Sequence, residues 1–281
     1  MLRREENQLR RGARRHSVRN RGAMNRGIIV AVVAVLVLGS VTAAFLSSRA
    51  AAPVEFIKSL NSSADRLSKL VISDDGEFLT AGSAAGEVFV WRLDNFRMSQ
   101  PGRATGAAIV SLGFAPDGLL LAGDATGGLR AWPSPDFKQQ DIESPKLPVT
   151  CFAFRGLGND QQILLGLSDG RLITITSDGH KSFDSGHAGL KTLVVTEDAE
   201  TLISTGTDGQ LIWHDIERER VEHRIAAHKT EVPVLAWSPD RKSLASADWN
   251  GLIKIWNPID RTETASMQHP DAISALVWRD D

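Results

Sequence analysis

The chain has 281 residues, of which 42% are hydrophobic and 23% are charged, and its formal net charge is −2. That value averages two opposed regions: residues 1–26 hold nine arginines against two glutamates, a net charge of +7, and the remainder carries −9. The single cysteine, Cys151, excludes an internal disulfide, and its apolar surroundings (VTCFAF) predict a buried thiol.

An uncharged apolar segment follows the basic tail. Residues 27–48 contain the run IIVAVVAVLVLG, and as a helix they would span about 33 Å, enough to cross a bilayer core. We therefore predict a cytoplasmic tail over 1–26, a transmembrane signal anchor over 27–48 that contacts the lipid bilayer, and a linker over 49–54. Because the basic side stays inside, the rest of the chain is expected outside the cytoplasm, in the periplasm if the source is bacterial.

A cleaved signal peptide is the alternative. Its apolar region would run from Ile28 to Leu38, with Val41 to Ala43 as a small-residue cleavage site. The long basic tail and the apolar run to Leu46 favour the anchor. Arg14 and Arg15 form only a weak twin-arginine signal, because polar residues follow them. Membrane topology accounts for the arginines, so no nucleic-acid binding is expected.

A unit of about 41 residues then recurs. A strand that follows a glycine turn ends at Trp91, Trp132 and Trp256, and the same position is held by Ile175 and His214. The steps are 41, 43, 39 and 42 residues. A period of about 40–45 residues with four short strands per unit is typical of a β-propeller blade. We predict an all-β fold over 55–281: a β-propeller of four-stranded antiparallel blades, with five complete repeats and a partial sixth.

The fifth unit, 227–257, shows the order of elements most clearly. A strand ends before the turn at Ser238 to Asp240, where proline and aspartate favour a turn. A second strand is expected over 243–247, and Asn250-Gly251 predicts a tight hairpin because both residues tolerate a positive φ. The third strand is 252–256. This alternation leaves no room for helices.

With these residues the chain resembles the WD-repeat propellers. In that family a His, a Ser or Thr, an Asp and a Trp form a structural hydrogen-bond set within a blade. The resemblance implies such sets in the fourth and fifth repeats, with Asn250 in place of the Asp and with Trp213 one residue before the Trp position. The implied residues are His187, Ser204, Asp208, His228, Ser246, Asn250 and Trp256.

Two other interpretations of the polar residues are weaker. His187, Ser204 and Asp208 have the composition of a hydrolytic triad, but Ser204 lies mid-strand and no G-x-S-x-G surrounds it, so no catalytic residue is expected. Acidic residues recur between second and third strands, where tight turns favour them over a metal site. They are Asp124, Asp169, Asp208 and Asp248. No cofactor motif appears, and no metal or cofactor is expected.

The last residues begin a sixth unit, since Trp278 aligns with Trp237 and Asp281 with Asp240. In the family the first segment, here 56–60, closes the last blade, which leaves this blade without its middle strands. Unpaired strand edges invite association. The sequence could be a fragment of a longer propeller, a partner or second copy could supply strands, or five blades could close with the tail outside. We favour the fragment.

These features predict a non-enzymatic, membrane-tethered scaffold that binds other proteins through propeller loops. Trp249, Asp248 and Lys229 are the candidate partner-binding residues, because tryptophan in a loop is unusual and is enriched at interaction hot spots. No small-molecule substrate is expected. The alternatives are an extracytoplasmic propeller enzyme, either a hydrolase or a quinone-dependent dehydrogenase, and an envelope-assembly platform. The nearly all-apolar first strands disfavour an enzyme.

Overall fold

The computed structural model describes residues 66–278, except 104–105, 135 and 157–159. These residues form twenty β-strands and no α-helix. The strands make five four-stranded antiparallel sheets, each built from four consecutive strands. We call these sheets blades one to five in chain order.

The strands of blades one and two are β1 (Leu67–Ile72), β2 (Phe78–Ser83), β3 (Glu87–Arg92), β4 (Met98–Arg103), β5 (Ile109–Phe114), β6 (Leu120–Asp124), β7 (Leu129–Trp132) and β8 (Gln140–Asp141). Blade three comprises β9 (Val149–Arg155), β10 (Gln162–Leu167), β11 (Arg171–Thr176) and β12 (Gly179–Asp184). Blades four and five comprise β13 (Leu190–Val195), β14 (Thr201–Gly206), β15 (Gln210–Asp215), β16 (Arg220–Ala226), β17 (Val234–Trp237), β18 (Leu244–Ala247), β19 (Leu252–Asn257) and β20 (Thr262–Gln268).

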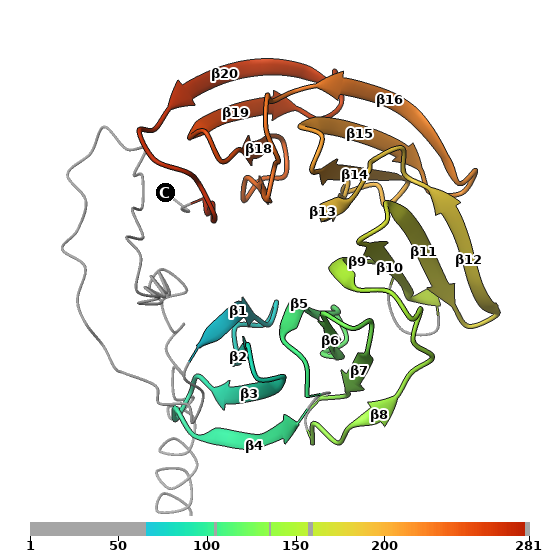
Figure 1. The fold of residues 1–281 in the computed structure, drawn as a ribbon, viewed down its shortest axis with the longest axis vertical. Helices are drawn as coiled ribbons and strands as arrows, with labels where there is room; N and C mark the ends of the chain where they lie inside the picture. Colours follow the sequence, from blue (N-terminus) through green and yellow to red (C-terminus); the bar gives the residue numbers. More distant parts are fainter. Residues whose placement is uncertain (1–65, 104–105, 135, 157–159, 279–281) are drawn as a thin grey trace, which may run out of the picture. The chain divides into compact units, whose positions relative to one another are not determined.

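The blades follow one another about a common centre, with the first strand of each blade innermost and the fourth outermost (Figure 1). Consecutive inner strands contact each other, from β1 to β5, β9, β13 and β17. The predicted all-β class and the four-stranded antiparallel sheets are confirmed. Among the described residues, no helix is long and apolar enough to span a membrane. The predicted tail, anchor and linker, and the segment 56–60, lie outside the described residues.

The part of the sixth unit that is described, up to Trp278, forms no strand. Its first residues nevertheless make the same backbone contact with blade five that the fifth unit makes with blade four. The Ile273 N–H donates to the Asp248 carbonyl at 3.3 Å, and Val232, one repeat earlier, donates to Gly206 at 3.2 Å. The Trp278 indole N–H donates to the carbonyl of Ala236 in β17 at 2.9 Å.

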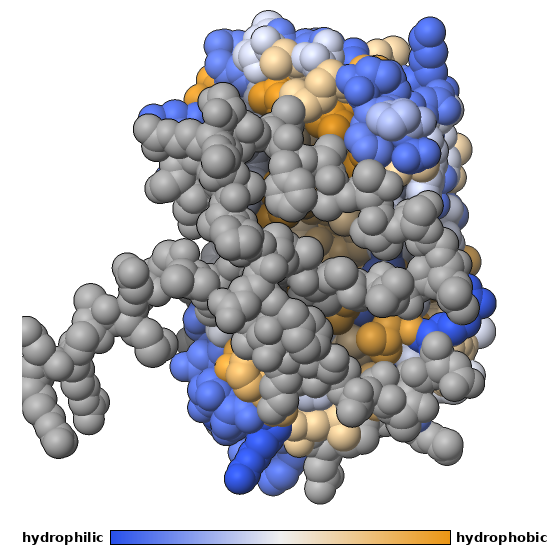
Figure 2. All heavy atoms as spheres, turned by 90° about the vertical axis from the view of Figure 1, so that its left-hand side faces the viewer, coloured by the Kyte–Doolittle hydropathy of each residue, from blue (hydrophilic) through white to orange (hydrophobic). Residues whose placement is uncertain are grey.

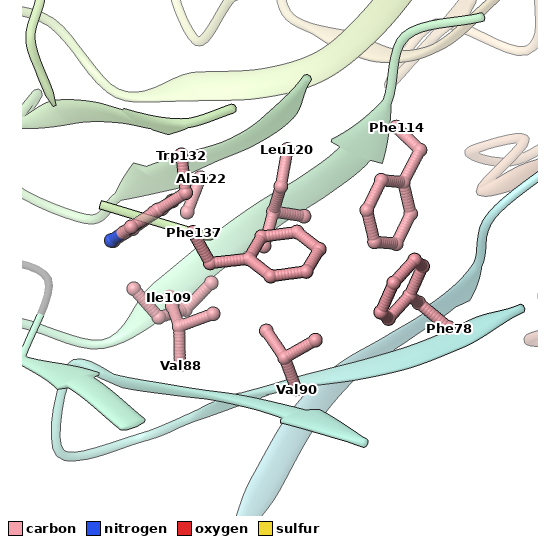
Figure 3. Packing of buried hydrophobic residues seen from close by; sticks show 9 residues of the cluster. All are labelled: Phe78, Val88, Val90, Ile109, Phe114, Leu120, Ala122, Trp132 and Phe137. Atoms are coloured by element: carbon pink, nitrogen blue, oxygen red, sulfur yellow. The ribbon is translucent and has the colours of Figure 1, made fainter. Parts of the chain in front are cut away.

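Hydrophobic side chains pack between neighbouring blades. One cluster joins blade one, through Phe78, Val88 and Val90, to blade two, and the ring of Phe137 lies between them (Figure 3). The centroid of that ring is 5.0 Å from the ring centroid of Phe78 and 6.4 Å from that of Phe114, edge-on in both cases. Seen from the side, hydrophilic residues gather toward the outer margins and hydrophobic residues lie further in (Figure 2). Where two described blades adjoin, each therefore buries an apolar face against the other.

The second strands carry glycine where the next blade comes closest. At Gly82 a Cβ would lie 2.6 Å from Ile109 Cγ2, and at Gly123 it would lie 2.6 Å from Ser111 Oγ and 2.9 Å from the Val149 carbonyl oxygen. The same position in blade three is Gly166. The absence of a side chain lets adjacent blades approach closely.

This packing gives a stability prediction. Gly123→Ala is expected to lower the free energy of unfolding by about 1–3 kcal/mol, because a methyl group would press on the Val149 carbonyl and the Ser111 hydroxyl. Urea titration followed by tryptophan fluorescence measures the change. Ser182→Ala, on the exposed surface of β12, is the control and is expected to leave stability nearly unchanged. Equal midpoints for Gly123→Ala and the control would show that the blades are not this closely packed.

Candidate functional site

Blade four contains a chain of four hydrogen-bonded polar side chains, of which His187, Ser204 and His214 are buried. His187 lies in the loop before β13 and places Nδ1 2.9 and 3.0 Å from the two carboxylate oxygens of Asp208. Its Nε2 lies 2.9 Å from Ser204 Oγ on β14. Ser204 Oγ is in turn 2.7 Å from Nε2 of His214 on β15. Ser204 and His214 are fully buried.

The geometry fixes which group donates each hydrogen bond when both histidines are neutral. The carboxylate can only accept, so His187 donates from Nδ1 and is left with an acceptor at Nε2. Ser204 has one hydroxyl proton, which it donates to His187. His214 must therefore donate its Nε2 proton to Ser204, and its Nδ1 becomes an acceptor. That buried Nδ1 has no hydrogen-bond partner in the described part of the chain.

This environment opposes charge on His214. Burial lowers the pKa of His214 from 6.5 to about 3, and His187 and Arg224 lower it further by charge repulsion. A second proton on Nδ1 would have no acceptor. The aromatic neighbour on the outer strand of blade three, Phe183, packs edge-on at 6.1 Å and offers none. His214 is thus a neutral hydrogen-bond donor in the folded protein.

Blade five builds the same arrangement with a tryptophan. His228 Nε2 lies 2.7 Å from Ser246 Oγ, and the Trp256 indole N–H donates to that oxygen at 2.8 Å. His214 in blade four therefore occupies the place that Trp256 takes here. The carboxylate beside His228 belongs to Asp248, with Oδ2 3.2 Å from Nδ1, in poorer alignment than in blade four. Burial lowers the pKa of His228, while Asp248 acts to raise it.

The structure corrects two residue assignments in blade five. Asn250 was predicted to stand in for the Asp, but it is exposed, and Asp248 approaches the histidine instead. Asp248 was predicted to bind a partner, but it is only 1% exposed. The reason is the hairpin geometry. Asp248 Oδ1 accepts the N–H groups of Asn250 and Leu252 at 2.9 Å each, which turns the carboxylate inward.

Hairpins in other blades use the same device. Three residues before the hairpin glycine, Ser83 and Asp124 accept backbone N–H groups two and four residues on, as Asp248 does. In blades three and four, Asp169 and Asp208 stand one residue before the glycine and accept the N–H two residues on. These acidic residues thus hold turns. Within the described ranges, no three His, Cys, Asp or Glu side chains are grouped so that they could hold a metal ion.

The hairpin of blade five also carries exposed residues beside its buried ones. Trp249 is 46% exposed, although it directly follows the buried Asp248. Lys229, beside the buried His228, is also exposed. Lys191 and Lys254 pair with Glu231 and Glu263, whereas Lys229 enters no ion pair with any described residue. An indole and an ammonium group therefore lie beside the contact between His228 and Asp248.

The comparisons with known proteins agree with this architecture. Residues 219–257 match the family model described as "WD domain, G-beta repeat". The β-propeller domain of Myceliophteria thermophila Cps50 (Swd1) has a TM-score of 0.64 at 15% identity and covers 74% of each chain, which supports the fold alone. Together these findings support a WD-repeat propeller.

Two curated proteins are similar in sequence. The periodic tryptophan protein 2 homolog of Dictyostelium discoideum is 25% identical over 233 residues, covering 79% of this chain and 25% of that protein. The pre-rRNA-processing protein IPI3 of Yarrowia lipolytica is 24% identical over 240 residues, covering 74% of this chain and 56% of that protein. This chain therefore matches only a quarter of one relative and about half of the other.

These relatives overturn the predicted localisation. A single-pass membrane protein with its propeller outside the cytoplasm was expected from residues 1–48, but neither relative is named as a membrane protein, and one is named for pre-rRNA processing. The localisation was predicted from the basic tail and the apolar run alone. No part of the propeller sequence was used to test that prediction.

The first prediction from this site concerns pH. The folded protein resists protonation of His214 and the unfolded chain does not, so the free energy of unfolding falls as the pH drops below 6.5. At 1.36 kcal/mol per pH unit, this residue contributes about 2 kcal/mol of that loss by pH 5. His214→Gln keeps a donor for Ser204 but does not titrate. Urea unfolding at pH 7 and 5 should show a correspondingly smaller loss in this variant. Equal losses would contradict the depressed pKa, since His228 titrates in both proteins.

The second prediction separates Asp248 from Asn250. Asp248→Asn is expected to destabilise the protein by about 1–3 kcal/mol, because the buried carboxylate beside His228 is lost. Asn250→Ala removes a side chain that is exposed and should change stability by less than about 0.5 kcal/mol. Thermal unfolding followed by circular dichroism compares the two. A larger effect at Asn250 would restore the assignment made from the sequence.

Proposed function

We propose that the chain is a non-enzymatic scaffold that binds other proteins through the loops of blade five, at a surface formed by Trp249 and Lys229. The observation that carries this proposal is an exposed indole on a backbone that is held in place. A partly exposed tryptophan is the residue type most enriched among interaction hot spots.

Hydrogen bonds hold the backbone of the hairpin that carries Trp249 in one conformation. Asp248 fixes the turn through its carboxylate, its N–H donates to the Leu252 carbonyl at 3.1 Å, and its carbonyl accepts from Gly251 at 3.1 Å. From the outer strand, the Gln268 side chain donates to the Asn250 carbonyl at 2.6 Å. A surface that is already ordered loses less entropy on binding. The relatives' names, which concern pre-rRNA processing and periodic tryptophan proteins, are compatible with assembly roles but specify no partner.

The geometry also supports a structural rather than catalytic role for the Ser–His–Asp set. Ser204 is fully buried, and its oxygen is already contacted by His187 and His214. A nucleophile must meet its substrate near donors that stabilise the oxyanion. With no exposed surface, Ser204 cannot meet a substrate unless blade four opens. A hydrolase that uses Ser204 as its nucleophile is therefore disfavoured.

Partner binding gives the test. The full chain is used to capture partners from lysate, and the affinity of a purified partner is then measured for Trp249→Ala, Lys229→Glu and a control. Trp249→Ala is expected to weaken binding about 30-fold, as for a hot spot of about 2 kcal/mol. Lys229→Glu should weaken it less and make binding less dependent on salt.

Ile259→Ala is the matched control, because Ile259 is 86% exposed and lies at the opposite end of β19 from Trp249. The control should bind as the unaltered protein does. Unchanged affinity in Trp249→Ala, or an equal loss in Ile259→Ala, would remove blade five's hairpin as the binding surface.

A further inference from the structure

The outer edge of blade five is less protected than the outer edges of the other blades. Each blade ends in an edge strand, and no further strand pairs with it among the described residues. Edge strands offer free backbone N–H and C=O groups, and proteins usually protect them with charge, proline or short length. The repeat makes the five edges directly comparable.

Blades one to four each show such protection. The edge strand β4 contains Pro101, which has no N–H to offer, and β8 is only two residues long. The six residues of β12 include three titratable side chains, His180, Lys181 and Asp184, and Lys181 pairs with Glu219 of blade four rather than within its own sheet. Four of the seven residues of β16 are titratable and exposed, namely Arg220, Glu222, His223 and Arg224.

The edge strand β20 has none of these features. Its sequence, TETASMQ, runs for seven residues without proline, and six of them are exposed. Its one charge, Glu263, is bound to Lys254 of its own sheet at 2.7 Å. A register shift bends the ladder between β19 and β20, but the same irregularity occurs between β15 and β16. The shift therefore does not distinguish the two edges.

We propose that β20 is an interaction edge that pairs antiparallel with β20 of a second copy of this chain, about a two-fold axis at Ala265. In that register Glu263 faces Met267, so no two like charges meet, and Thr264 faces Ser266. Seven paired residues bury far less than the roughly 1,200 Å² of a stable interface, so the dimer is weak and depends on concentration. The edge lies outside the loop surface of the proposed function and is independent of it.

Sedimentation equilibrium of the full chain over a wide concentration range tests the proposal. The average mass of the unaltered protein should rise towards that of a dimer. Ala265→Lys places two ammonium groups against each other at the axis, and should stay monomeric throughout the range. His223→Lys makes the matched change at the centre of β16 and should dimerise normally. A monomeric unaltered protein, or equal behaviour of the two lysine variants, would overturn the proposal.

A crosslink provides a second measurement that does not depend on the lysine variant folding. Residues opposite each other in an antiparallel pair have Cα atoms about 4.5–5.5 Å apart, within reach of a disulfide. The native Cys151 is buried, and burial raises its pKa to about 12, so it should not react. Ala265→Cys should therefore give a covalent dimer under mild oxidation, and His223→Cys should not. Monomer only from Ala265→Cys would reject this register.

Discussion

Burial of sheet faces against neighbouring sheets is the constraint on which the structure depends. A four-stranded sheet with apolar residues on both faces cannot exclude water alone. Here the clusters bridge successive blades: Phe78 meets Phe114 and Phe137 across the first junction, and Leu164 of blade three packs with Leu202 of blade four at the third. The close approach of blades then limits the size of side chains on second strands, which explains Gly82 and Gly123.

Polar side chains divide the described blades into two groups. Blades four and five place a buried histidine between a hairpin carboxylate and a strand serine, and so connect the loop before the blade to its second strand. In blades one and two, Ser83 and Asp124 hold the hairpins, and no histidine stands beside them. A buried hydrogen-bond network fixes its surroundings more firmly than packing alone. The loops of the last two blades are therefore the best prepared to hold a binding surface in one conformation.

The fold was predictable because the period of the tryptophans and the Asp-Gly and Asn-Gly hairpins are local signals that recur. The contacts within blade five were less predictable, because alignment on the glycine placed Asn250 opposite Asp208. A different signal was present: Ser83, Asp124 and Asp248 all stand three residues before the glycine. That Asp248 is buried while Trp249 is exposed depends on how the turn closes, and no periodicity encodes it. The membrane prediction failed because it depended on a segment that the repeats do not constrain.

A repeat protein also contains its own controls, since each position can be compared across blades. Where all copies agree, the residue serves the architecture, as the hairpin glycines do. Where one copy departs without a structural cause, function is the better explanation. Two residues before the hairpin glycine, blades one to four carry small or polar residues, namely Ala84, Ala125, Ser168 and Thr207, whereas blade five carries Trp249. His214 departs in the opposite sense: it replaces a tryptophan, yet its partner Ser204 shows that the change preserves a buried hydrogen bond. The same comparison thus assigns Trp249 to the surface and His214 to the core.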